Sequence, residues 1–458
     1  MRVQTRGLFH APSVFSLLYS LDFLRCALRG LRALPGFATR GRDPRRGGGG
    51  GAASPGSGDA AQAATTSTTL RASVLDGRLI AGYQAWYGCP GDYDGNTLWI
   101  HWFDTVAEVG RITVDMLPDV SQLPASSLCD SGLRLADGQA LQLYSAMDPA
   151  LVDLQFSQMA ASGVKAVALQ RFVSWLADPV LKRRVDRVLD NAMAAAQRHQ
   201  LPLYITYDVS GADEASVLQS IRQDWAAVHG RYDLATHAAY LRDNGHPVLQ
   251  LWGFGFTDRP GQPAAVRQLI VDLKKGQGAP AAFTIGGVPS RWSSLSGDSK
   301  SAAEWAGVYA AYDVISPWTV GRYGNAQEAA AYIAGLQREQ RTLAVRNGQG
   351  FLPVVFPGFS SRNLMATRNQ AVPLNQIPRD CGRLLAAQLQ GLAANGARSA
   401  YVAMFDEMDE ATAMLPMLAR QAQVPGGVSA VTLDQDGCSL PADHYLQALK
   451  DAALRFKP

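Results

Sequence analysis

Short apolar segments alternate with amphipathic stretches along the chain from residue 79 onward. The segments are five to eight residues long and rich in small, β-branched and aromatic residues, a pattern typical of strands that are buried on both faces of a parallel sheet. We count eight such segments: 79–86, 167–172, 203–209, 248–254, 283–287, 314–320, 352–359 and 400–405.

Most of the stretches between these segments have helical periodicity. Residues 181–198 place one apolar face at Val185, Val188, Leu189, Ala192 and Ala195. Residues 383–394 follow the seventh segment in the same way, and a last helix is expected over 442–456, closing the bottom or the flank of the domain. Eight repeats of a strand followed by a helix predict an α/β fold, namely a (β/α)8 TIM barrel, that forms a single catalytic domain over residues 71–458. A doubly wound open sheet is the alternative.

Polar and aromatic residues collect where the predicted strands end. Because (β/α)8 barrels carry their active site at the carboxyl ends of the strands, we expect these residues to bind a substrate. They are Tyr83, Trp86, Tyr87, Gln170, Arg171, Tyr207, Asp208, Trp252, Arg291, Trp292, Trp318, Arg322, Phe359 and Asp406. Each one alone would more often be a core or a solvated residue, so the prediction depends on their recurrence at equivalent positions.

A long insert, residues 88–144, follows the first predicted strand. It is rich in Gly, Asp and Pro and contains His101 and Trp102, which suit the face and the hydroxyls of a sugar. Because a loop of this length in a compact domain is commonly part of a binding site, we expect both residues to contact substrate. A packed structural loop would have a similar sequence.

Four carboxylates stand at the end of the eighth segment: Asp406, Glu407, Asp409 and Glu410. Like-charge repulsion raises the pKa of some members of such a group, so that one can be protonated while another is ionised near neutral pH. If the chain turns helical here, Glu407 and Glu410 project to one side with the separation of roughly 5–5.5 Å that retaining glycosidases use. Asp406 and Asp409 would then tune or orient them. A solvated acidic strand end is the alternative.

Five motifs, spread in order over about residues 75–420, resemble glycoside hydrolase family 99. This family contains endo-α-mannosidase-like (β/α)8 barrels and related bacterial proteins loosely labelled xylosidase/arabinosidase. The motifs are Tyr83-Gln-Ala-Trp86-Tyr87-Gly88-Cys-Pro90, His101-Trp102, Tyr207-Asp208-Val-Ser-Gly211, Pro357-Gly358-Phe359 and Phe405-Asp-Glu407-Met-Asp-Glu410. The last motif is the most specific of the five.

The resemblance implies a retaining hydrolase that uses neither a metal nor a cofactor. In the family, the first Glu of the pair is thought to act as base on the sugar 2-hydroxyl, which gives a 1,2-anhydro intermediate, and the second as general acid/base. By motif match these roles fall to Glu407 and Glu410. The usual Asn-Glu-Trp-His-Glu-Gly pattern reads Asp406-Glu-Met-Asp-Glu-Ala411 here, so the subsite around both carboxylates is altered. The resemblance therefore implies the two glutamates and leaves open whether the α-linked glycan is mannan-like or a related polysaccharide.

The charge of the chain is unevenly distributed. Residues 1–46 hold nine Arg and two Asp, a net +7, whereas the whole chain has +3 and the remainder therefore −4. A mildly acidic body argues against binding of nucleic acid, and nine Trp favour an oligo- or polysaccharide partner. Residues 1–40 are a possible atypical signal or leader and 41–70 a Gly/Ala/Ser-rich linker. The apolar run 7–21 is too short and polar for stable membrane insertion.

Four of the five cysteines, Cys89, Cys129, Cys381 and Cys438, lie in the predicted domain. No Cys-x-x-Cys or His spacing suggests a zinc site. Two disulfides, 89 with 129 and 381 with 438, are possible if the protein is exported, and four buried thiols are the equal alternative. Export is favoured over a cytoplasmic location, although a misassigned start codon would explain the same N-terminus.

Three functions remain to be compared. We expect a monomeric glycosidase that acts on an α-linked glycan. A catalytically inactive carbohydrate-binding barrel is the main alternative. A barrel lyase or metal hydrolase is disfavoured because His-x-His, His-Glu-x-x-His and Gly-x-Ser-x-Gly are all missing from the sequence.

Overall fold

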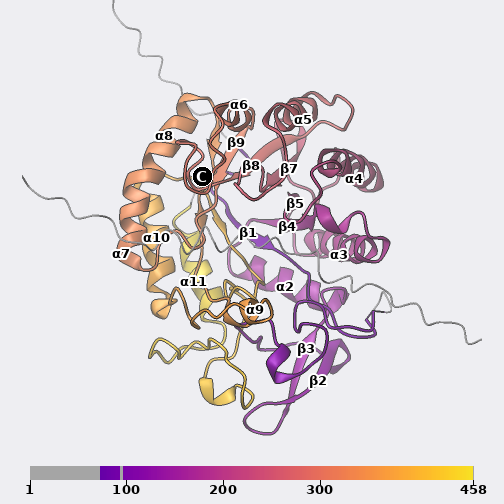
Figure 1. Ribbon diagram of the computed structural model, residues 1–458, viewed down its shortest axis with the longest axis vertical. Helices are drawn as coiled ribbons and strands as arrows, with labels where there is room; N and C mark the ends of the chain where they lie inside the picture. Colours follow the sequence, from indigo (N-terminus) through magenta and orange to yellow (C-terminus); the bar gives the residue numbers. More distant parts are fainter. Residues whose placement is uncertain (1–72, 93–95, 457–458) are drawn as a thin grey trace, which may run out of the picture.

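A parallel sheet of eight strand positions forms the centre of the molecule (Figure 1). The computed structural model describes residues 73–92 and 96–456, so the predicted leader and linker lie outside the described residues. The strands are β1 (Leu79–Tyr83), β4 (Ala166–Phe172), β5 (Leu203–Asp208), β7 (His246–Trp252), β8 (Phe283–Val288), β9 (Val314–Pro317), β10 (Gly350–Phe351), β11 (Val354–Val355) and β12 (Ala400–Val402). Each of the eight predicted apolar segments supplies one position.

The seventh segment closes the sheet into a ring. The strand order runs β10-β9-β8-β7-β5-β4-β1-β12-β11, and only Leu352 and Pro353 separate the two terminal strands of that order. Leu352 N donates to Ile315 O in β9, while Tyr401 N in β12 donates to Pro353 O. One stretch of chain therefore pairs with both neighbours. The (β/α)8 prediction is confirmed, and an open doubly wound sheet is rejected.

Helices surround this ring on its outside (Figure 1). They are α2 (Pro149–Ala161), α3 (Pro179–Arg198), α4 (Val217–Tyr232), α5 (Pro263–Lys275), α6 (Glu304–Tyr309), α7 (Ala326–Tyr332), α8 (Arg338–Arg346), α10 (Arg383–Ala394) and α11 (His444–Ala453). The short α9 (Arg362–Ala366) lies in the connection between β11 and α10. The starts of α2 and α3 follow from local sequence, because Asp148 and Asp178 cap the first turn and Pro occupies the first helical position.

The predicted helices are observed with small changes of boundary. Residues 383–394 form α10 as predicted, and residues 181–198 lie within α3, which begins two residues earlier behind its cap. The last helix is shorter than the predicted 442–456 and contacts α2 and α10, so it covers the flank of the barrel. No helix among the described residues has the length and apolar content needed to cross a bilayer.

The insert after β1 contains structure that the sequence analysis missed. Strands β2 (Leu128–Arg134) and β3 (Ala140–Tyr144) form an antiparallel hairpin around Asp137-Gly138, a dipeptide typical of tight turns. A disulfide between Cys89 and Cys129 joins this hairpin to the segment that follows β1, and a second joins Cys381 to Cys438. The prediction of two disulfides is therefore confirmed, and the alternative of four separate thiols is not.

Candidate active site

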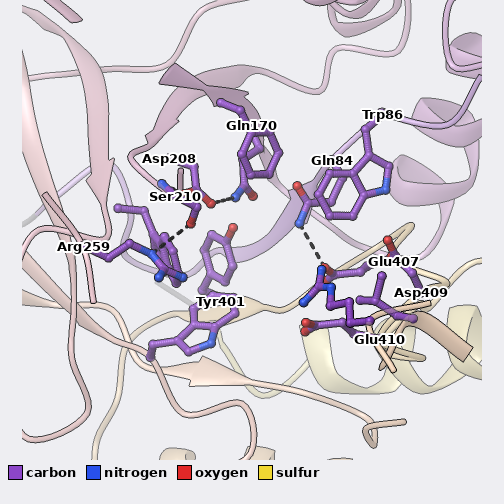
Figure 2. Close-up of a pocket in the computed structure, with 15 residues that line it drawn as sticks. Gln84, Trp86, Gln170, Asp208, Ser210, Arg259, Tyr401, Glu407, Asp409 and Glu410 are labelled. Atoms are coloured by element: carbon purple, nitrogen blue, oxygen red, sulfur yellow. Dashed lines mark hydrogen bonds between the residues drawn. The ribbon is translucent and has the colours of Figure 1, made fainter. Parts of the chain in front are cut away.

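A cleft lies at the carboxyl ends of the strands, where a (β/α)8 barrel is expected to carry its site (Figure 2). It encloses about 820 Å³ of space free of protein atoms, part of which is open to solvent. The cleft is lined by Gln84, Trp86, Gln170, Phe172, Asp208, Ser210, Trp252, Arg259, Trp318, Leu364, Arg368, Tyr401, Glu407, Asp409 and Glu410. Aromatic rings and carboxylates therefore share one concave surface.

Glu407 lies on this surface but is itself buried. Its carboxylate accepts hydrogen bonds from Gln84 Nε2 at 3.4 Å and Thr412 Oγ1 at 3.0 Å. Burial raises the pKa of Glu407 well above its ordinary value, and the charges of Glu410 and Asp409 raise it further.

Glu410 lines the same cleft (Figure 2). Burial first, and then the charge of Asp409, raise the pKa of Glu410 to about 8, while Arg368 and Arg259 act in the opposite direction. Residues 408–411 form turns, so the helical turn on which the predicted projection of the two glutamates was conditional is not formed. The two glutamates are brought together all the same; their predicted carboxyl separation stays a prediction.

Asp406 connects the acidic segment to the end of β1. Its two carboxylate oxygens accept hydrogen bonds from Gln84 N at 2.8 Å and Ala85 N at 2.7 Å. Burial raises the pKa of Asp406 to about 7. Asp406 is not among the residues that line the cleft, so its contacts are those of a residue that fixes the backbone beside Glu407.

Asp409 is held by two residues that the sequence analysis placed in the site. Tyr87 Oη donates to Asp409 Oδ1 at 3.0 Å, and His101 Nδ1 lies 3.1 Å from Asp409 Oδ2. The imidazole of His101 also stacks on Trp86, with ring centroids 4.0 Å apart. Tyr87 and His101 thus stand behind the lining residues Asp409 and Trp86.

The opposite side of the cleft carries a second polar group (Figure 2). Asp208 accepts hydrogen bonds from Gln170 Nε2 at 2.5 Å and from Ser210 N at 2.7 Å, and burial raises its pKa. Arg259 Nε donates to Ser210 Oγ at 3.1 Å. Gln170 and Asp208 therefore both line the cleft, and their contact with a substrate stays a prediction.

Two further predicted aromatic residues, Trp252 and Trp318, line the cleft and meet edge to face, with ring centroids 5.2 Å apart. The indole Nε1 of Trp318 and the side-chain Oε1 of Gln84 are buried without a hydrogen-bond partner among the described residues. Buried polar groups are usually satisfied. These two atoms are therefore available to hydroxyl groups of a ligand.

Three predicted site residues point away from the cleft, and the alternation of a strand explains why. Arg171 follows the inward Gln170 and is buried outside the ring in ion pairs with Asp224 and Asp186. In the same way, Tyr207 precedes Asp208 and donates from Oη to Asp224 Oδ2 at 2.6 Å.

The third, Tyr83, precedes Gln84 and donates from Oη to Gln155 Oε1 in α2 at 2.5 Å. For all three, the predicted substrate contact is corrected to a contact between strand and helix layer.

The remaining predicted residues also lie outside the lining set. Trp102 is buried and donates from Nε1 to Tyr144 O at 2.8 Å. Arg322 pairs with Asp298, whereas Arg291 is exposed. Trp292 packs edge to face on Tyr309, and Phe359 pairs through its backbone with Ile377. These five residues therefore do not line the cleft in which the other predicted residues lie.

Eight lining residues were not predicted as substrate contacts: Gln84, Phe172, Ser210, Arg259, Leu364, Arg368, Tyr401 and Asp409. The alternation of strand residues could have identified Gln84 and Tyr401. Arg259, Leu364 and Arg368 come from long connections after β7 and β11, where no periodic pattern indicates which residues turn inward.

Among residues 73–92 and 96–456, no group of three or more His, Cys, Asp or Glu side chains is arranged to hold a metal ion. Searches of family models and of curated proteins found no match to the chain.

Solved structures do match. Two structures of the family 99 endo-α-mannosidase from Bacteroides thetaiotaomicron superimpose with a TM-score of 0.59. One of them is in complex with bis-tris propane. They are 16% and 15% identical to this chain, and each alignment covers 83% of this chain and 98% of the other. The chain has the fold of a family 99 glycoside hydrolase. At this identity the likeness establishes the fold, in agreement with the resemblance carried by the motifs.

Proposed function

We propose that this protein is a retaining glycoside hydrolase that cleaves an α-linked glycan, mannan-like or a related polysaccharide, with Glu407 and Glu410 as the acid/base pair. One observation carries the proposal: both carboxyl groups line a single cleft with aromatic walls, and the charge of Glu410 raises the pKa of Glu407, which favours a state in which only one of the two is protonated. The glycoside hydrolase fold supports it. The unpartnered Oε1 of Gln84 and Nε1 of Trp318 offer contacts for sugar hydroxyls.

The division of labour follows the family resemblance. Glu407 takes the proton of the sugar 2-hydroxyl as O2 attacks the anomeric carbon, and Glu410 gives its proton to the departing glycosidic oxygen. A 1,2-anhydro sugar results. Glu410, now ionised, then removes a proton from a water that opens this ring, and Glu407 returns its proton to O2. Both glutamates end in their starting states, and the configuration at the anomeric carbon is retained.

This cycle needs Glu407 ionised while Glu410 is protonated. Because burial raises the pKa of both carboxyls, and the charges of neighbouring carboxylates raise it further, the working pH range lies above that of two ordinary glutamates. The two groups titrate as a coupled pair, so the limbs of the pH profile belong to the pair. We expect a bell-shaped dependence of kcat/KM whose alkaline limb falls near pH 8.

The test is a screen of the full chain against α-mannan and other polysaccharides with analysis of the released products. Glu407→Gln and Glu410→Gln should each lower kcat by at least about 100-fold, and leave the melting temperature at pH 5 nearly unchanged. Glu339→Gln removes an exposed carboxylate from α8 and serves as the matched control. Full turnover by both site variants would refute the assignment.

A carbohydrate-binding barrel without catalysis is the second candidate. It is favoured by the departure from the family pattern, since Met408 and Asp409 replace the usual Trp-His pair between the two glutamates. Calorimetric binding of a glycan together with no released reducing sugar across the panel would support it. Either candidate implies an oligo- or polysaccharide partner, and sedimentation velocity would test the expected monomer.

A further inference from the structure

Arg379 is buried behind the acidic segment and contacts it through the backbone. The residue is 4% exposed and does not line the cleft. Its Nη2 donates to Ala411 O at 2.9 Å and to Ala413 O at 2.6 Å. A guanidinium is always protonated and can only donate, so these contacts do not depend on pH. Arg379 therefore holds the backbone on both sides of Thr412, two residues after Glu410.

Thr412 connects this restraint to Glu407. Its Oγ1 donates to Glu407 Oε2 at 3.0 Å, and its backbone N donates to Glu407 O at 3.1 Å. Thr412 is itself buried. Because the carbonyl groups before and after Thr412 are held by one guanidinium nitrogen, the backbone that carries the threonine side chain is restrained. The hydroxyl is thereby presented to the carboxylate that the proposed function uses as a base.

The loop after β11 contacts both Arg379 and the second glutamate. Gly358, the centre of a motif that the sequence analysis singled out, allows the close approach. A Cβ at this position would lie 2.6 Å from Arg379 Cγ and 2.9 Å from Ile377 O, so a larger residue would displace the arginine. Two residues further on, Ser360 N donates to Glu410 O at 3.0 Å. One loop therefore fixes the position of Arg379 and the backbone of Glu410.

The surroundings of Arg379 are not those of a residue that serves stability alone. Nε and Nη1 are buried without a hydrogen-bond partner among the described residues. Nη2 contacts two carbonyl groups and Met116 Sδ rather than a carboxylate, and the ring of Tyr445 lies 4.5 Å from Cζ. A buried cation that is only partly satisfied is costly. The conformation that Arg379 imposes explains its presence better than the stability that it adds.

We propose that Arg379 is a positioning residue for the proposed reaction, because it holds the backbone around Thr412 so that the threonine hydroxyl stays on Glu407. The inference rests on the proposed function for its catalytic meaning. A hydroxyl that donates to a carboxylate favours its ionised form, which is the form in which Glu407 accepts the proton of the sugar. Loss of the restraint leaves less of Glu407 in this form and should affect kcat more than binding of the glycan.

The experiment begins with Arg379→Lys. Lysine keeps the positive charge but is shorter and lacks the rigid planar guanidinium. The kcat on an accepted glycan should fall about tenfold, while KM changes by less than about twofold. Thr412→Val removes the hydroxyl and should cause a similar loss. If Arg379 acts through Thr412, the double variant should be no slower than the slower single one, whereas independent effects would multiply to about 100-fold.

A titration tests the same connection without turnover. Carboxyl-selective carbon NMR follows Glu407 in the unliganded full chain, and its resonance is identified by its loss in Glu407→Gln. Thr412→Val and Arg379→Lys should each raise the titration midpoint by about half a pH unit, a factor of about three, and the double variant by no more than the larger single effect. The other groups that face Glu407 are unchanged in these variants: Gln84, Tyr401, Asp406, Asp409 and Glu410.

Arg383→Lys makes the same substitution at an exposed arginine in the first turn of α10 and is the matched control, with neither kcat nor the midpoint changed. If Arg379→Lys does not fold, Gly358→Ala is measured in its place, since the added methyl group displaces the arginine without changing its chemistry.

An unchanged kcat or an unchanged midpoint in a folded variant would overturn the inference, as would losses that multiply in the double variant. A parent protein that cleaves no glycan would overturn the proposed function alone, because the titration requires no turnover and still tests the link between Arg379 and Glu407.

Discussion

Removal of the carboxylate of Asp224 is expected to be among the most damaging changes outside the cleft. The guanidinium of Arg171 has a side-chain exposure of 1%, and that of Asp224 is 3%. Two hydrogen bonds, from Nε at 2.9 Å and from Nη2 at 2.7 Å, join Arg171 to both oxygens of Asp224. In Asp224→Ala the guanidinium would remain buried with Asp186, itself partly exposed, as its main counter-ion.

Loss of one partner from a buried ion pair costs about 3–5 kcal/mol. Tyr207 Oη also loses its acceptor in this variant, which places the expected loss in the upper part of that range. For a chain of this size the melting temperature should fall by roughly 4–6 °C. Because neither Arg171 nor Asp224 lines the cleft, kcat/KM measured well below the melting temperature should be unchanged.

The assay is urea unfolding followed by circular dichroism, with the parent protein and the double variant Arg171→Met/Asp224→Leu as comparisons. The double variant should lose less free energy of unfolding than Asp224→Ala, because no uncompensated charge stays buried. A loss below about 1 kcal/mol for Asp224→Ala, or a double variant that is worse than the single one, would refute the account of this network as a buried and mutually dependent pair.

Three further results are expected. Trp86→Ala should raise KM about tenfold, which corresponds to about 1.4 kcal/mol of binding, with a smaller change in kcat, as measured by initial rates on an accepted glycan. The melting temperature of the parent should fall as pH rises from 5 to 8, because Asp406 and Glu410 have pKa values of about 7 and 8 in the folded protein, above those of the unfolded chain. The resulting stabilisation is complete below the unfolded pKa values and is lost as pH rises through the folded ones. Glu410→Gln should therefore reduce the fall in melting temperature. Cys89→Ser/Cys129→Ser should lower the free energy of unfolding by about 4 kcal/mol in urea titrations, since the disulfide closes a loop with a sequence separation of 40.

The barrel could be predicted because each strand is a short apolar run and each helix has a clear periodicity. Even the start of α3 could be predicted from local sequence, because Asp178 caps its first turn. The site was predicted less completely, and the errors have a physical pattern. Adjacent residues of a strand point to opposite sides, so Gln170 reaches the cleft whereas Arg171 reaches the helix layer.

Loop residues escaped prediction for a different reason. Arg259 and Arg368 reach the cleft only because the connections after β7 and β11 fold back over the mouth of the barrel. Such a path is fixed by tertiary contacts, for example by Asp115, which accepts hydrogen bonds from Arg362 N and Asn363 N at the start of α9. Asp115 lies almost 250 positions away from these residues, and no local rule connects them.

The division of the seventh strand position into β10 and β11 gives the barrel a seam. Each half contributes only two residues to the ladder, one half to β9 and the other to β12. Elsewhere in the ring, neighbouring strands share longer ladders, such as the six paired positions of β4 and β5. The ladders of the wall are thus shortest at the seam, and the connection that follows β11 carries the lining residues Leu364 and Arg368. Local opening of the ring is expected to begin there, while β12, which precedes the glutamate pair, would keep its ladder with β1.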